Sequence, residues 1–200
     1  ASLPMYDFGP ASAAQDRLWQ LAVAELAQIG IAAPGTLARG LPDLMPHWLA
    51  PDLLMSQTCG SPYRNRLHGK VTLIGTPDYR VEGCPPGYYC SVLVARTDDP
   101  RTALAEFDAA ALAYNDALSQ SGWAAVQTEA TALGITLRPG LQTGAHRASV
   151  KAVADGKADL ASIDAVTWRL LRPMDADAQR LKVIGHTTPT PGLPLITAQK

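Results

Sequence analysis

Residues 143–164 read TGAHRASVKAVADGKADLASID, and this stretch decides the fold. Its pattern predicts a tight turn at Gly144, a helix that ends at Gly156, and a short buried strand that ends on Asp164. In open α/β sheets, ligands bind beyond the carboxyl ends of the strands, and the free N–H groups at a helix start favour an anion. The stretch therefore predicts an anion cradle beside a carboxylate, for a ligand that carries both charges or a hydroxyl group.

The composition is that of a globular protein without a strongly charged face. Its 200 residues, 47% hydrophobic with a net charge of −1, suffice for one large domain or two small ones. The 17 Lys and Arg residues are scattered, which argues against a nucleic-acid partner and against a membrane-surface patch. No run of 18 apolar residues occurs, so no membrane-spanning helix is expected. The chain begins without a signal-peptide pattern, so we expect either that a signal was removed before Ala1 or that the protein has none.

The cysteines leave the cellular compartment open. Because there are three of them, at least one thiol is free. A disulfide between Cys59 and Cys84, a disulfide between Cys84 and Cys90, and three free thiols are all compatible with the sequence.

The hydrophobic pattern outside the opening stretch alternates between strands and helices, which is typical of α/β proteins. Strands are expected at residues 3–6, 52–56, 71–75, 89–95, 111–115, 135–142, 160–164, 181–185 and 195–197. Helices are expected at residues 12–29, 43–48, 63–67, from 98 onward, 123–133, 144–155 and 166–171. A capping box of Ser12 and Gln15 is expected to open the first helix.

This order is βαβαβ twice over, which predicts two lobes with two crossings between them. The crossings are expected along residues 89–95 and 186–194. The first lobe is then formed by residues 1–92 with 187–200, and the second lobe by residues 93–186.

Three turns of small polar residues follow predicted strands, at residues 56–60, 119–122 and 143–146. One such turn is ordinarily just a helix cap, but three of them would converge on one cleft if the lobes face each other. A tetrahedral oxyanion suits such turns, because it accepts many hydrogen bonds from neutral donors and needs no Lys or Arg. The candidate ligand contacts in these turns are Ser56, Thr58, Ser119, Gln120, Ser121, Gly122, Thr143 and His146.

Two residues of the opening stretch have alternative roles. His146 is a ligand contact, a catalytic base or a capping residue, and its place at a helix N-terminus should lower its pKa. Asp164 is either a ligand contact or only the cap of the next helix. Tyr6, at the end of the first expected strand, is the tyrosine best placed to reach a cleft.

Catalytic and cofactor motifs are absent from the sequence. The four histidines show no metal-ligand spacing, and neither a dinucleotide fingerprint nor a phosphate-binding loop occurs, so no metal and no cofactor are expected. Cys59 at a predicted helix start and His146 form a conceivable nucleophile pair, in a context unlike a known nucleophile turn.

Several of these motifs together resemble a known family. TGAHRAS at 143–149, AVADGKAD at 152–159, Asp164, PTPGLP at 189–194 and the serine turn SQSG at 119–122 are similar to the substrate-binding proteins of phosphate, phosphite and phosphonate ABC importers, the PhnD-like family. The resemblance implies an α/β fold of the type II periplasmic-binding-protein class, in which two Rossmann-like lobes are joined by a two-strand hinge and a ligand is trapped by closure.

The resemblance also implies roles for individual residues. The serine turn would hold the phosphonate or phosphate oxygens with His146, Asp164 would contact an amino or protonated group, and Tyr6 would line the other wall. Two features depart from the family. Gln120 stands where a further hydroxyl is more typical, and the chain stops at Lys200 where members usually continue, so a C-terminally truncated form is expected.

The function expected from these features is that of a solute-binding protein. It would capture a small phosphorus oxyanion (phosphonate, phosphite or phosphate) in an interlobe cleft, as a monomer, and deliver it to the permease of an ABC importer. The expected compartment is the periplasm, with a cytoplasmic variant as the alternative. Two rival functions stay open: an enzyme on the same fold that uses Cys59 or His146, and a ligand-sensing module that reports to a partner protein.

Overall fold

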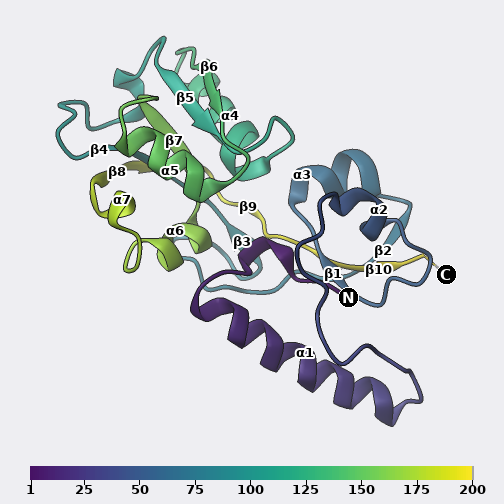
Figure 1. The fold of residues 1–200 in the computed structure, drawn as a ribbon. Helices are drawn as coiled ribbons and strands as arrows, with labels where there is room; N and C mark the ends of the chain where they lie inside the picture. Colours follow the sequence, from purple (N-terminus) through teal and green to yellow (C-terminus); the bar gives the residue numbers. More distant parts are fainter. Residues whose placement is uncertain (200) are drawn as a thin grey trace. The chain divides into compact units, whose positions relative to one another are not determined.

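The computed structural model describes residues 1–199, and its contacts divide the chain into two compact units (Figure 1). The first unit comprises Ala1–Pro77 with Gly192–Lys200, and the second comprises Asp78–Pro191. Residues 78–92 and 187–191 therefore group with the second unit rather than with the first. The reason is that strands β3 (Tyr88–Tyr89) and β9 (Thr190–Pro191) pair with each other inside that unit.

The second unit is built on a five-stranded mixed sheet in the order β6-β5-β7-β4-β8. Its strands are β4 (Ser91–Arg96), β5 (Ala111–Tyr114), β6 (Arg138–Gln142), β7 (Leu160–Asp164) and β8 (Leu181–His186). Strand β5 runs parallel to β6 and β7, whereas β4 runs antiparallel to β7 and β8. The parallel strands confirm the expected βαβ order, and they bring the ends of β5 and β7 to the same edge of the sheet.

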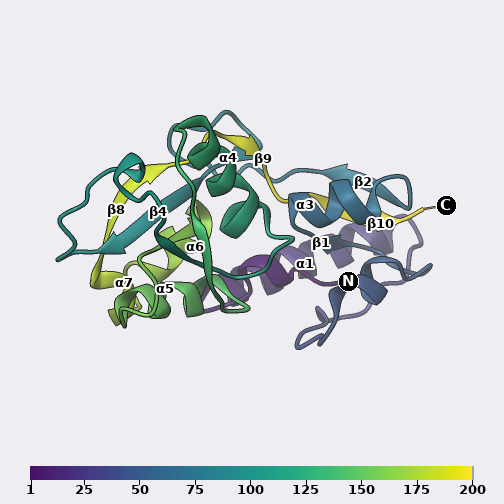
Figure 2. The same cartoon turned by 90° about the horizontal axis from the view of Figure 1, so that it is seen from above.

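Helices cover both faces of this sheet. They are the π-helical turn η4 (Gln120–Ala124) with α4 (Ala125–Ala132), α5 (His146–Ala154), α6 (Ala165–Leu171) and the unexpected short α7 (Ala176–Gln179). The chain runs from β5 through α4 to β6, and then from β6 through α5 to β7. Because β6 and β7 lie on opposite sides of β5, right-handed crossovers put α4 and α5 on opposite faces of the sheet (Figure 2). Between α4 and the sheet lies a core whose large members include Phe107, Leu112, Val126 and Leu160. Burial of each such side chain stabilises the unit by about 1.5–3 kcal/mol.

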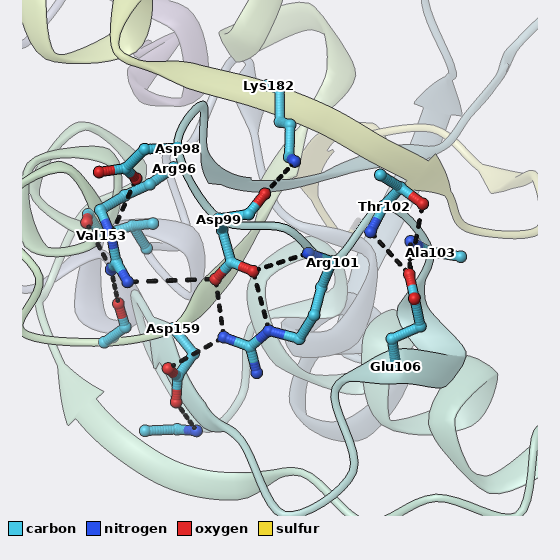
Figure 3. Close-up of polar contacts among 12 residues, drawn as sticks. Arg96, Asp98, Asp99, Arg101, Thr102, Ala103, Glu106, Val153, Asp159 and Lys182 are labelled. Carbon is cyan, nitrogen blue, oxygen red and sulfur yellow. Dashed lines mark hydrogen bonds and ion pairs between the residues drawn. The ribbon is translucent and has the colours of Figure 1, made fainter.

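An ionic cluster surrounds the loop that follows β4 in the second unit, where a helix was expected from residue 98 (Figure 3). Only a 3-10 turn, η3 (Leu104–Glu106), forms there. The expected helix is wrong because the Asp99 carboxylate is bound by Arg101 instead: it accepts hydrogen bonds from the Arg101 backbone N–H at 3.0 Å, from Nε at 2.9 Å and from Nη2 at 2.7 Å. Arg101 also bonds Asp159 at 3.3 Å, and Asp159 accepts from the Ala111 N–H at 2.7 Å, which ties the cluster to the start of β5.

The described part of the first unit holds a small antiparallel sheet and five helical segments. The sheet has the order β1-β10-β2, formed by β1 (Ser56–Gln57), β10 (Leu195–Ala198) and β2 (Val71–Gly75). The helical segments after η1 (Pro4–Tyr6) are α1 (Pro10–Gln28), α2 (Leu44–Trp48), α3 (Gly60–Pro62) and the π-helical η2 (Tyr63–Leu67). Trp19 of α1 and Trp48 of α2 anchor two separate clusters of buried side chains, so this unit has its own core.

Three local expectations for the first unit are wrong. Residues 4–6 form a 3-10 turn rather than a strand, because Pro4 has no N–H to donate to a sheet, and the parallel pairing reduces to a single bridge between Ser2 and Ser56. The strand expected at 52–56 contains only Ser56 and Gln57. No capping box opens α1, whose cap is Gly9 with Pro10 at the first helical position. Across the part of the chain that the structure describes, no helix is long and apolar enough to span a bilayer.

Candidate functional site

The serine turn lies where the chain leaves β5 and enters η4. Ser119 caps this helix, and its Oγ accepts a hydrogen bond from the Gly122 N–H at 3.0 Å. The Ala124 N–H reaches back five residues to the Ser119 carbonyl at 3.0 Å, so the first turn is a wide π-turn. Turns of this kind are rare in proteins as a whole, and those that do occur often lie at functional sites. Ser119, Gln120 and Ser121 are all buried here.

The second turn of the predicted site lies beside the first. The Thr143 N–H donates to the Tyr114 carbonyl at 2.8 Å, and the Gly144 N–H donates to the Asn115 carbonyl at 2.9 Å. Gly144 has φ +81°, a left-handed conformation that favours glycine. These contacts extend the β5–β6 pairing past the ends of both strands, and they bring two turns together that lie 21 to 27 residues apart in the sequence.

The two turns meet in one side-chain contact: Ser121 Oγ lies 2.9 Å from His146 Nε2. His146 is the first residue of α5, after the cap residue Ala145. Burial of the imidazole lowers the pKa of His146 to about 4, and the nearby Ser162 backbone carbonyl opposes this shift only in part. His146 is therefore neutral at pH 7, as expected for a histidine at this position.

The guanidinium of Arg147, the residue after His146, binds a carboxylate of its own. Arg147 is exposed, and its Nε donates to Asp175 at 2.7 Å, 28 residues along the chain. The donors that Ser121, His146 and the helix starts offer are thus neutral hydroxyl, imidazole and backbone groups. Such a set suits an oxyanion that is held by many hydrogen bonds without a direct ion pair.

Asp164 ends β7 and caps α6. Its Oδ1 accepts hydrogen bonds from the N–H groups of Val166 at 2.8 Å and Thr167 at 3.0 Å, and the residue is 2% exposed. The capping role that the sequence left open is therefore formed. A contact between Asp164 and a ligand remains a prediction.

The predicted contacts in the first unit are also buried. Ser56 Oγ lies 2.7 Å from Ser2 Oγ and accepts from Trp48 Nε1 at 3.1 Å, so this hydroxyl helps to hold the fold of its own unit. Thr58 donates its N–H to the Pro194 carbonyl at 3.0 Å, and Tyr6 is buried at the end of η1. The structure brings together Ser119–Gly122, Thr143 and His146 in the second unit, and it places Tyr6, Ser56 and Thr58 in the first.

Two serines that touch the site were missed by the sequence analysis. Ser91 Oγ donates to the Ser121 carbonyl at 3.0 Å, and Ser162 Oγ donates to the same carbonyl at 2.5 Å. Each is a lone hydroxyl in an otherwise apolar buried strand, CSVLVA or LASI. A buried polar side chain needs a hydrogen-bond partner, and this requirement is the signal that could have identified the two serines.

The three cysteines are divided between the two units, and none of them forms a disulfide within residues 1–199. Burial together with the neighbouring Cys84 raises the pKa of the Cys90 thiol to about 12. Cys59 belongs to the first unit, while His146 of the second is bonded to Ser121. Within residues 1–199, no group of three His, Cys, Asp or Glu side chains is placed to hold a metal ion.

A cavity of about 580 Å³ lies elsewhere on the second unit, against α6, and is lined by residues that include Trp168, Arg172 and His186. It contains none of the residues predicted for the site.

Comparison with known proteins relates the chain to one family. Residues 63–200 match the family model described as "ABC transporter, phosphonate, periplasmic substrate-binding protein". No curated protein matches the chain.

Similar solved structures include those of three bacterial proteins. PhnD1 from Prochlorococcus marinus, in complex with methylphosphonate, has a TM-score of 0.75 at 12% identity, over 98% of this chain and 75% of that one. XAC2383 from Xanthomonas citri, bound to ATP, has a TM-score of 0.66 at 18% identity, over 91% and 71%. A binding protein component of an ABC phosphonate transporter from Pseudomonas aeruginosa has a TM-score of 0.56 at 17% identity, over 98% and 67%. At these identities the likeness shows the fold, which is that of the type II periplasmic binding proteins.

Proposed function

Because the chain belongs to the family of periplasmic substrate-binding proteins of phosphonate ABC transporters, we propose that it captures a small phosphorus oxyanion for such an importer. The family consists of transport proteins that bind a small ligand and interact with a permease, not of enzymes. The ligand class proposed for this chain is phosphonate, phosphite or phosphate. We further propose that the protein acts as a monomer in the periplasm.

The observation that carries the proposal is the contact between Ser121 and His146 at the starts of two neighbouring helices. Because one of these two groups donates to the other, a tetrahedral oxyanion bound there would receive a hydrogen bond from either the hydroxyl or the imidazole, and further hydrogen bonds from backbone N–H groups of the first helical turns. The Ser119–Gly122 turn and Thr143 would complete this cradle. Since His146 is neutral at pH 7, anion binding at this site does not depend on a cationic imidazole.

We propose that the Asp164 carboxylate contacts the group that is attached to the anion. Its Oδ1 caps α6 and would keep this role when the same carboxylate contacts the ligand. A protonated oxygen or an amino group of the ligand would be the chemical partner. Tyr6, Ser56 and Thr58 stay predicted contacts of the first unit.

Isothermal titration with methylphosphonate, phosphite, inorganic phosphate and sulfate tests the function. We expect a phosphorus oxyanion to bind, and we expect Ser121→Ala and His146→Ala each to weaken its binding about tenfold or more, since a hydrogen bond to a charged group is worth about 1.5–3 kcal/mol. Arg147→Ala is the matched control, because Arg147 is the next residue and faces Asp175 instead. If none of the phosphorus anions binds to the unchanged protein, the proposed function is wrong.

A further inference from the structure

One peptide unit of the serine turn is held at both ends. The carbonyl of Ser121 accepts the hydroxyls of Ser162 at 2.5 Å and of Ser91 at 3.0 Å. The N–H of the same peptide unit belongs to Gly122 and donates to Ser119 Oγ at 3.0 Å. Because a peptide unit is planar and rigid, bonds to its oxygen and to its nitrogen together set its orientation.

The two hydroxyls come from paired strands of the sheet. Strands β4 and β7 are antiparallel, with Ser91 opposite Asp164 and Leu93 opposite Ser162. Opposite residues share a face of the sheet, and so do residues two apart on one strand. Ser91 and Ser162 are therefore diagonal neighbours on one face, and both are at most 1% exposed.

Ser91 is itself anchored from a third segment. Its N–H donates to Thr187 Oγ1 at 2.9 Å, and its carbonyl accepts from the Thr187 N–H at 2.9 Å. The hydroxyls that hold the turn thus project from the ordered centre of the sheet and not from a loop.

The contacts exceed what a helix start requires. A carbonyl oxygen has two lone pairs, and the two serine hydroxyls are enough to occupy both. Their donation keeps the Ser121 oxygen directed toward the sheet, whereas the Ser121 hydroxyl is directed toward His146. This matters for anion binding, because a carbonyl oxygen that faced the anion would repel it.

We propose that Ser91 and Ser162 are positioning residues of the anion site, which hold the Ser121–Gly122 peptide so that the Ser121 hydroxyl meets His146 and no carbonyl faces the ligand. The ligand part of this inference rests on the proposed function. The positioning of Ser121 against His146 is a property of the unliganded protein, and it is testable without any ligand.

The first test measures the ¹⁵N chemical shifts of the His146 imidazole, which report the hydrogen bonding of Nε2. The signals are assigned by their loss in His146→Gln. We expect Ser162→Ala, Ser91→Ala and the double variant to move the Nε2 signal toward that of an unbonded imidazole, as Ser121→Ala does. Ser162→Thr and Ser91→Thr keep the hydroxyl and should restore the original signal.

The control for a merely structural effect is Val94→Ala. Val94 lies on the same strand as Ser91 and is fully buried, so this variant destabilises the same sheet without touching the turn. We expect it to lower the melting temperature and to leave the His146 signal unchanged. If Val94→Ala moves the signal as much as the serine variants do, or if the serine variants leave it in place, the positioning role is wrong.

The second test measures methylphosphonate affinity by isothermal titration in the same variants. We expect a loss of about five- to tenfold for each single serine variant, which corresponds to one neutral hydrogen bond, and a return of affinity in the threonine variants. Unchanged affinity in both alanine variants would overturn the inference while leaving the proposed function intact. If the unchanged protein does not bind methylphosphonate, the proposed function fails for this ligand, and the imidazole signal alone decides the positioning role.

Discussion

Gly122 lies where a side chain has no room. A Cβ at this position would overlap the carboxamide oxygen of Asn115 and come within 3.3 Å of Ser119 Oγ. The Asn115 oxygen is buried and has no hydrogen-bond partner among the described residues. The close approach of this carboxamide therefore explains why the serine turn contains glycine at its third helical residue.

We predict that Gly122→Ala destabilises the second unit by about 1–3 kcal/mol and weakens anion binding, because the Asn115 side chain must move and the turn must open. Chemical denaturation and isothermal titration measure the two effects. The control is a double-mutant cycle with Asn115→Ala, which removes the group that the new methyl would meet. If Asn115→Ala does not restore part of the stability in the Gly122→Ala background, the overlap is not the cause.

The lowered pKa of His146 predicts that the folded protein loses stability in acid. Its folded value of about 4 lies below the ordinary value of 6.5, so the unfolded chain binds the proton more readily. The stabilisation from a neutral His146 is therefore complete above about pH 6.5 and is lost as the pH falls toward 4. The loss should be on the order of 2 kcal/mol, given that the residue is half-buried.

His146→Gln isolates this effect, since glutamine does not titrate. The free energy of unfolding is measured by urea denaturation between pH 4 and pH 7 in both proteins. His47 of the first unit contributes to the same window, because burial lowers its pKa as well, so the informative quantity is the difference between the two curves. Parallel curves for the two proteins would contradict the assigned burial of the imidazole.

At the scale of elements, the ionic cluster around Asp99 and Arg101 adds polar contacts to segments that also share a hydrophobic core (Figure 3). Arg101 lies between the carboxylates of Asp99 and Asp159 and over the ring of Phe107, 4.0 Å from its centre. The Asp99 backbone carbonyl also accepts from Lys182 of β8. The cluster thus connects the loop after β4 with the starts of β5 and β8.

We predict that Asp99→Asn lowers the free energy of unfolding by about 2–3 kcal/mol. The reason is that the Arg101 guanidinium then loses the buried carboxylate that accepts two hydrogen bonds from it. The Arg101 guanidinium holds the pKa of Asp99 at about 2, below the ordinary 3.8. The stabilisation is therefore present above about pH 4 and is lost as the pH falls toward 2. Urea denaturation at pH 7 measures the first effect.

Asp98→Asn is the matched control for this cluster. Asp98 is the preceding residue, its side chain is 84% exposed, and it lies 3.6 Å from Arg96. An exposed ion pair of this kind contributes about 0–1 kcal/mol. Equal losses from the two variants would mean that burial does not set the strength of the Asp99 contacts.

At the scale of the whole molecule, ligand binding and stability are linked. A phosphorus oxyanion that binds only the folded protein should raise the free energy of unfolding by about 2.7 kcal/mol at one hundred times its dissociation constant. A thermal-shift series with methylphosphonate measures this, with Ser121→Ala as the variant that should need a higher ligand concentration for the same shift. A shift that is identical in both proteins would show that the anion binds away from the serine turn.

The binding of the anion to the folded protein also predicts which backbone amides are protected from hydrogen exchange. The residues of the proposed anion cradle, Ser119–Gly122, Thr143 and His146, all belong to the second unit, so amides of η4 and α5 should exchange more slowly when methylphosphonate is present. Hydrogen exchange read by mass spectrometry measures this. Protection that is confined to α1, which belongs to the first unit, would place the anion elsewhere.

The elements that the sequence predicted well are those with a strong local pattern. Residues 143–164 form the turn, the helix and the strand expected of them, and α1 and β8 lie where their periodicity placed them. The expectations that failed depended on a competing local contact. Pro4 has no backbone N–H to donate to the expected first strand. The hydrogen bonds between Asp99 and Arg101 formed in place of a helix start.

Local pattern alone thus determined the class of the fold, the family resemblance, and the candidate turns at 119–122 and 143–146. Only the tertiary structure decided that these turns meet at Ser121 and His146, and that Ser91 and Ser162 hold the turn from 30 and 41 residues away. The physical reason is that periodicity and turn chemistry act over a few neighbouring residues. A hydrogen bond between distant strands depends instead on register, which is set when the whole sheet packs.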